Sequence, residues 1–140
     1  MSNNTISTVI GLRLVQHQRG SRLAARLCYS PDDPYAVYIA FGAGQGKPVE
    51  WMVARDLLAT GMWHRAGVGD VTVWPSTGSA AGGLGAVLNI EISSPAGQAH
   101  FEAAVNEVSS FLHRTYEAVP AGEESPDVDA ELATLLREAS

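Results

Sequence analysis

The stretch Gly42-Ala43-Gly44-Gln45-Gly46-Lys47 is the part of the sequence that most resembles a phosphate-binding loop. A P-loop needs a glycine five residues before its Gly-Lys pair and Ser or Thr after that pair. Phe41 and Pro48 stand at these two positions. The dinucleotide-binding fingerprint needs a third glycine where Lys47 stands, and then a helix. We therefore interpret the stretch as a loop that connects two strands, and we expect no nucleotide cofactor.

Histidine, cysteine and serine lack the spacing of a metal site or of a nucleophilic enzyme. A His-x-x-x-His pair and a Gly-x-Ser-x-Gly motif do not occur, and a single cysteine, Cys28, excludes a Cys-only zinc site. Cys28 lies in an alternating run, which favours a small buried side chain over a reactive thiol. The sequence therefore predicts no metal, no cofactor and no enzymatic activity. The four histidines are His17, His64, His100 and His113.

Two adjacent pairs, Glu50-Trp51 and Arg55-Asp56, place opposite charges near a tryptophan. A carboxylate beside an indole can act as an acid or base, and the alternative is a structural ion pair at a sheet edge. No hydrolase or transferase arrangement assembles from these residues, so we favour the ion pair.

Charge is distributed unevenly along the 140 residues, whose formal net charge is -6. Residues 1–95 hold seven Lys/Arg and six Asp/Glu, whereas residues 96–140 hold two Lys/Arg and nine Asp/Glu. An acidic chain disfavours nucleic-acid binding, which depends on cations that neutralise phosphates. A sheet face that carries Trp51, Trp63 and Trp74 remains an alternative platform for single-stranded nucleic acid.

Period-2 alternation of apolar residues predicts six strands in the first two-thirds of the chain. Two prolines in the stretch 30–34 predict a fixed corner between the second and third strands, because proline cannot donate to a strand ladder. The six predicted strands run through residues 10–14, 23–29, 37–41, 49–53, 71–74 and 88–92.

Helical patterns dominate the last third of the chain. A short helix is predicted near 55–60. Ser94-Pro95 has the form of a helix start, and apolar residues spaced by three and four predict a long helix over 94–119. Ser125-Pro126 repeats this start signal, which predicts a C-terminal helix over 126–139.

These elements predict a single domain over residues 1–140, with a strand-rich body over 8–93. The expected fold class is α+β, an antiparallel six- to seven-stranded curved sheet or barrel with C-terminal helices packed on it. We find no signal peptide and no run of about 20 apolar residues that would predict a membrane span. A cytoplasmic location is therefore expected.

Several short motifs follow one another along the chain. They are Asp33-Pro34-Tyr35-Ala36-Val37, Val49-Glu50-Trp51, Ala54-Arg55-Asp56-Leu57-Leu58, Gly69-Asp70-Val71-x-Val73-Trp74-Pro75, Ser93-Ser94-Pro95-x-Gly97, Phe111-Leu112-x-Arg114-Thr115 and Val119-Pro120-x-Gly122. In residue types and in order, this set resembles the motifs of the SsgA-like family of sporulation and cell-division proteins, from about Leu12 to the C-terminus. The ending Trp74-Pro75 and the compact tail resemble the B-type members most.

The resemblance implies a noncatalytic adaptor that helps to localise the tubulin-like GTPase FtsZ at sporulation septa. It also implies a fold similar to that of the whirly single-stranded-DNA-binding proteins, a homotrimer, an A-type family member as partner, and no stable nucleic acid. Fold kinship with nucleic-acid binders is analogy and does not transfer their function.

Candidate contact residues come from the family motifs and from the acidic third of the chain. We expect an acidic face on the long helix and a second contact at the corner that contains two prolines. The candidates are Asp33, Pro34, Tyr35, Glu50, Trp51, Arg55, Asp56, Trp74, Glu102, Glu107 and Glu117.

Overall fold

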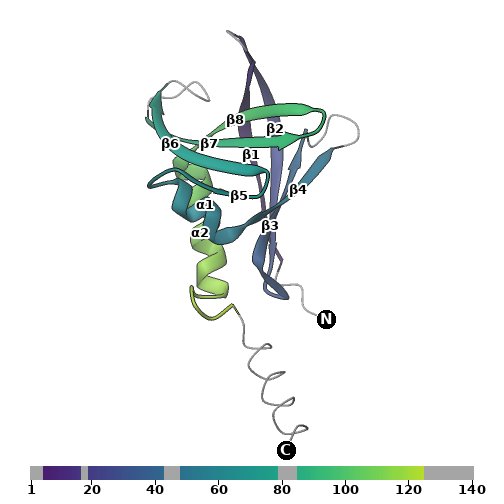
Figure 1. Cartoon of the computed structure of the whole chain (residues 1–140). Helices are drawn as coiled ribbons and strands as arrows, with labels where there is room; N and C mark the ends of the chain where they lie inside the picture. Colours follow the sequence, from purple (N-terminus) through teal and green to yellow (C-terminus); the bar gives the residue numbers. More distant parts are fainter. Residues whose placement is uncertain (1–4, 17–18, 43–47, 79–84, 125–140) are drawn as a thin grey trace, which may run out of the picture.

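The computed structural model of the chain describes residues 5–16, 19–42, 48–78 and 85–124 (Figure 1). These residues form eight strands and two helices. The strands are β1 (Ile6–Gln16), β2 (Arg19–Ser30), β3 (Asp33–Phe41), β4 (Val49–Ala54), β5 (Ala66–Val68), β6 (Val71–Gly78), β7 (Gly85–Ser94) and β8 (Gly97–Ala104), and the helices are α1 (Arg55–Gly61) and α2 (Val105–Ala118).

All eight strands belong to one antiparallel sheet with the order β4-β3-β2-β1-β8-β7-β6-β5. The chain forms two successive meanders of four strands, and each meander is followed by a helix. The β1–β8 pairing joins the two meanders, and β4 and β5 lie at the two ends of the sheet. The helices lie side by side at one end of the curled sheet (Figure 1).

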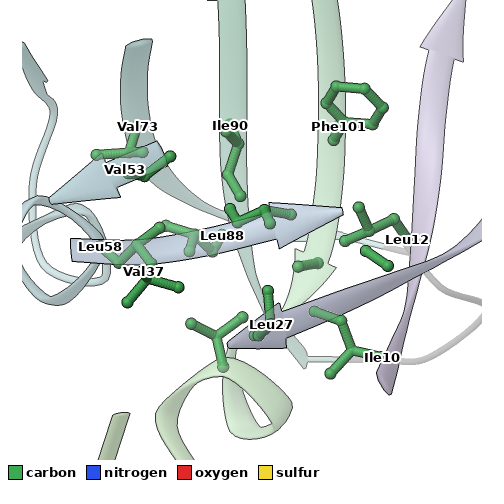
Figure 2. Packing of buried hydrophobic residues seen from close by; sticks show 14 of the residues in the cluster. Ile10, Leu12, Leu27, Val37, Val53, Leu58, Val73, Leu88, Ile90 and Phe101 are labelled. Atoms are coloured by element: carbon green, nitrogen blue, oxygen red, sulfur yellow. The ribbon is translucent and has the colours of Figure 1, made fainter. Parts of the chain in front are cut away.

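The sheet curls into a half-barrel around one apolar interior. The ring centroids of Phe41 on β3 and Phe101 on β8 lie 4.4 Å apart, although two strands separate β3 from β8 in the sheet. Only strong curvature brings these two rings into contact. Inward side chains of both meanders, among them Leu27 and Leu88, meet in the same core (Figure 2).

The period-2 alternation used to predict the strands corresponds to the inner face of this sheet. Val37, Ile39 and Phe41 are buried, while the residues between them are only half-buried. The predicted α+β class with a curved antiparallel sheet is confirmed, and so is the short helix near 55–60, which is α1. The sheet has eight strands rather than six or seven.

The predicted long helix over 94–119 is wrong in its first part. Residues 95–96 form the turn of a hairpin, in which Ser94 pairs with Gly97, and Gly97 has a φ of 142° that favours glycine. The Ser94 hydroxyl accepts a hydrogen bond from the Ala96 N–H, so the expected helix cap closes a turn instead. The strand-rich body therefore extends to Ala104, and the helix begins at Val105.

The helical pattern includes β8 because Phe101 has helical spacing with Val105 and Val108, which are apolar positions of α2. Pairing with β7 and β1 on both sides overrides this local pattern, since a central strand satisfies all its backbone groups within the sheet. The predicted C-terminal helix over 126–139 lies outside the described residues. In the part of the chain that the structure describes, no helix is both long and apolar enough to cross a membrane.

Gly61, at the end of α1, provides a test of the packing between this helix and the sheet. A Cβ atom on Gly61 would lie 2.6 Å from Val73 Cβ and 3.1 Å from Leu88 Cδ1. We expect Gly61→Ala to lower the free energy of unfolding by about 1–3 kcal/mol, because overpacking displaces buried side chains. Gly11→Ala is the matched control, since a Cβ there meets nothing within 4 Å. Equal urea midpoints for the two variants would contradict this packing.

Candidate functional site

Arg55, the first residue of α1, is the most deeply buried charged side chain of the described residues, at 1 % exposure. Its Nη1 donates to the carbonyl oxygens of Thr115 (3.0 Å) and Val119 (2.8 Å) at the end of α2. Its Nη2 forms an ion pair of 2.8 Å with the Glu124 carboxylate. The guanidinium therefore ties the start of one helix to the end of the other. We call Arg55 and its partners the Arg55 clamp.

Two tyrosine rings hold the guanidinium of Arg55 by cation–π contact. Arg55 Cζ lies 4.0 Å from the ring centroid of Tyr116 and 5.0 Å from that of Tyr29. The Tyr116 hydroxyl donates to Asp56 Oδ1 (2.9 Å), and the Tyr29 hydroxyl donates to the Pro34 carbonyl (3.0 Å). The clamp thus joins residues of four of the matching motifs, namely Pro34, Arg55 with Asp56, Thr115 and Val119.

The environment favours an ionised Glu124 and neutral Tyr29 and Tyr116 near neutral pH. The hydrogen bond from Arg55 lowers the pKa of Glu124 from its usual value of 4.5, against the opposing effect of burial. Burial and the hydrogen bond to Asp56 raise the pKa of Tyr116, and burial raises that of Tyr29. An Arg–Glu pair between two neutral phenols is suited to holding two helices together, and among the described residues the Arg55 Nε is the one buried side-chain nitrogen or oxygen that lacks a hydrogen-bond partner.

The predicted contact corner lies at the start of β3, after a tight turn from β2. The Asp33 carboxylate accepts a hydrogen bond of 2.7 Å from the Tyr38 hydroxyl, while the ring of Tyr35 is half exposed. Tyr35 and Asp33 line a groove of about 310 Å³ at the end of the sheet. We call it the edge groove; its walls are Asp33, Tyr35, Ala36, Met52, Val53, Ala54, Leu57, Val68 and Val71.

The three tryptophans named for the alternative nucleic-acid platform lie apart. Trp51 on β4 packs against the core, Trp63 follows α1 and is exposed, and Trp74 lies on the outer face of β6. Glu50 is exposed on β4, on the face opposite to Trp51. No single face therefore presents the set of aromatic rings that stacks successive bases.

Trp74 belongs to a network that the sequence analysis did not find. Arg65 Cζ lies 4.5 Å from its ring centroid, and the His100 ring lies 5.0 Å away on β8. Asn89 donates through Nδ2 to the Trp74 carbonyl (3.1 Å) and to the Ser76 hydroxyl (2.8 Å), so its Oδ1 accepts from His100 Nε2 (2.8 Å). The hydrogen-bonded members of this network lie on β6, β7 and β8. They are aligned by the register between these strands, which a local sequence pattern does not reveal.

The acidic face expected on the long helix is incorrect for one of its three members. Glu102 lies on β8 and forms an ion pair of 2.6 Å with Arg13 on β1. Glu107 and Glu117 lie on α2 and are exposed, and the Glu117 carboxylate lies 3.5 Å from His113 Nε2. The acidic surface of α2 thus contains two of the predicted glutamates.

A metal-binding cluster does not appear among the residues that the structure describes. No three His, Cys, Asp or Glu side chains gather there at metal-binding distance. The charged groups that do meet, in the Arg55 clamp and at Arg13–Glu102, are paired with one another. These two ion pairs connect elements that lie far apart in the sequence.

The burial of Arg55 predicts an unequal response to two similar substitutions. Arg55→Met removes the donor of two carbonyl oxygens and the cation between two rings, and should lower the free energy of unfolding by roughly 3 kcal/mol. Arg13→Met removes a partly exposed Arg–Glu pair and should cost less than about 1 kcal/mol. Urea unfolding measures both, and Arg55→Lys provides an intermediate if Arg55→Met does not fold. Equal losses would contradict a buried clamp.

The lowered pKa of Glu124 predicts that the free energy of unfolding depends on pH, and that Glu124→Gln removes this dependence. A carboxyl with a lowered folded-state pKa adds stability above its unfolded pKa, near 4.5, and loses this contribution as pH falls through the folded pKa. Wild type should therefore be more stable than the variant near neutral pH, and the difference should shrink as pH falls below about 4.5. Urea midpoints from about pH 7 to about pH 3 test this; a constant difference would contradict it.

Comparisons with known proteins agree with this fold and its motifs. The model of the family described as "Streptomyces sporulation and cell division protein, SsgA" matches residues 23–124. The relative named "Sporulation-specific cell division protein SsgB" from Thermobifida fusca is 50% identical over 138 residues, which cover 96% of this chain and 97% of that protein. The protein of the same name from Streptomyces coelicolor is 45% identical and covers 97% of this chain and 98% of its own.

Solved structures show the same architecture. The crystal structure of the SsgA-like sporulation-specific cell division protein from Thermobifida fusca matches with a TM-score of 0.81 at 49% identity, over 96% of this chain and 98% of that one. A structure from work on SsgB mutations and longitudinal cell division in Streptomyces coelicolor matches with a TM-score of 0.79 at 44% identity, over 86% and 92% of the two chains. The chain belongs to the SsgA family of sporulation and cell division proteins.

Proposed function

We propose that the chain is a noncatalytic adaptor of cell division, which helps to recruit the tubulin-like GTPase FtsZ to sporulation septa. The observation that carries this proposal is the family membership, since relatives at 39–50% identity are named sporulation-specific cell division proteins. The internal contacts fit this proposal, because the Arg55 clamp bonds to the end of α2 and to Glu124 and so holds elements of the fold together.

We propose further that the adaptor works as a cytoplasmic homotrimer at the septum, together with an A-type member of the family. Repeated copies of one weak contact reinforce each other on a polymer through a high effective concentration. The exposed features available for such contacts are the edge groove, the two glutamates of α2 and the indole of Trp63. They lie on separate elements, so one subunit can contact more than one partner.

Co-sedimentation with FtsZ polymers tests the proposed function. We expect the full chain to pellet with FtsZ assembled in the presence of GTP, and to remain in the supernatant when GDP prevents assembly. Adding the A-type protein should increase the pelleted fraction. If the chain stays in the supernatant in every nucleotide state and at every salt concentration, with and without the A-type protein, the proposed function is wrong.

Binding of single-stranded nucleic acid, the other function considered from the sequence, is not proposed. The guanidinium of Arg65 lies against the half-buried ring of Trp74, 4.5 Å from its centroid. Among the described residues, the remaining tryptophans are either packed on the core or isolated after α1. The structure offers no observation that favours this function over a protein contact.

A further inference from the structure

The edge groove is an apolar depression whose walls remain exposed. Tyr35, Met52 and Val68 are 51%, 61% and 63% exposed, and they come from β3, β4 and β5. The buried side chains of Val53 and Leu57 also line the groove. Three large apolar side chains around one hollow are unusual on a free surface, since apolar groups in contact with water carry an energetic cost.

A free strand edge lies beside the groove. β4 pairs with β3 along its whole length, from Val49–Phe41 to Ala54–Ala36. Among the described strands, none pairs with the other edge of β4, because β4 ends the sheet. Alternate N–H and C=O groups of an edge strand point away from the sheet and can pair with an added strand. The groove therefore offers both a backbone template and a pocket for side chains.

The charge around the edge groove is negative. Asp33 is the one charged residue of its walls within the described chain, and its carboxylate is held by the Tyr38 hydroxyl. Glu50 lies on the same face of β4 as Met52, two residues earlier, and is exposed. Arg65, which precedes β5, is directed onto the Trp74 ring. A ligand with positive charge beside its apolar group complements this surface.

We propose that the edge groove binds an extended segment of a partner protein that carries apolar side chains flanked by Lys or Arg. The segment adds as a strand to the free edge of β4 and inserts an apolar side chain between Tyr35, Met52 and Val68. Its cationic residue lies near Asp33. This assignment goes beyond the proposed function, because it names a surface and the chemistry of its ligand and holds for any partner with such a segment.

Two substitutions at similarly exposed sites distinguish binding in the edge groove from binding elsewhere on the sheet surface. Met52→Lys places a cation at the groove wall, which should repel a basic segment. Val9→Lys makes the same change at a residue of β1 that is 52% exposed and outside the groove. Because both side chains are exposed, both variants should unfold at nearly the wild-type temperature.

A fluorescent peptide, Arg-Val-Thr-Leu-Thr-Val-Thr-Arg, serves as the probe, and the same peptide with both Arg replaced by Glu is its control.

Binding is measured by fluorescence anisotropy, and by the methyl NMR signals of methionine in the wild-type chain. We expect the Arg peptide to bind, to shift the signal of Met52 and to leave that of Met62 in place. Met52→Lys should weaken binding about tenfold or more, while Val9→Lys should not. The proposal is overturned if the Arg peptide does not bind, if the Glu peptide binds as tightly, or if Val9→Lys weakens binding as much as Met52→Lys.

Failure of this inference can be distinguished from failure of the proposed function. If the wild-type chain binds the Arg peptide but does not sediment with FtsZ, the groove assignment stands and the division partner is wrong. If the chain sediments with FtsZ but does not bind the peptide, the proposed function stands and the groove assignment is wrong. If Met52→Lys abolishes self-association and the peptide does not bind, the groove is a contact between copies of this chain, which also overturns the proposal.

Discussion

The buried guanidinium of Arg55 imposes the constraint on which the arrangement of the two helices depends. A buried cation is tolerated only when counter-charge and acceptors surround it. Here the acceptors are the last carbonyls of α2 and the carboxylate of Glu124, so the end of α2 must lie at the start of α1. Each helix follows one four-stranded meander, and the clamp therefore also fixes how the two halves of the sheet are covered.

This constraint changes the meaning of the family motifs. The charges of Arg55 and Asp56 predicted an ion pair at a sheet edge, but each residue bonds to a distant element: Arg55 to the end of α2, and Asp56 to Tyr116. Pro34 contributes its carbonyl oxygen to Tyr29, which stacks on the same guanidinium. These motif residues hold the fold together, and we propose that partners contact side chains that remain exposed, such as Tyr35.

The sequence allowed the fold class to be predicted because alternation along a strand is a local property, and inward residues such as Val37 and Ile39 repeat every second position. Two other features could not be predicted from the sequence, for physical reasons. β8 continues into α2 without a break in apolar spacing, and only its neighbours β1 and β7 decide that it is a strand. The partners of Arg55 and Trp74 lie far away in the chain and meet through strand register and helix packing, which no local pattern encodes.

The open form of the sheet is the feature with most consequence for binding. A closed barrel would pair β4 with β5 and leave no free edge, whereas a half-barrel leaves both end strands unpaired within the described chain. The seven-residue helix α1 connects these two strands, places Leu57 in the edge groove and packs Gly61 closely against Val73. The first residue of the same helix is Arg55. The clamp that joins the two helices therefore also anchors the helix that lines the groove, so loosening the clamp should disturb the surface that we propose binds a partner.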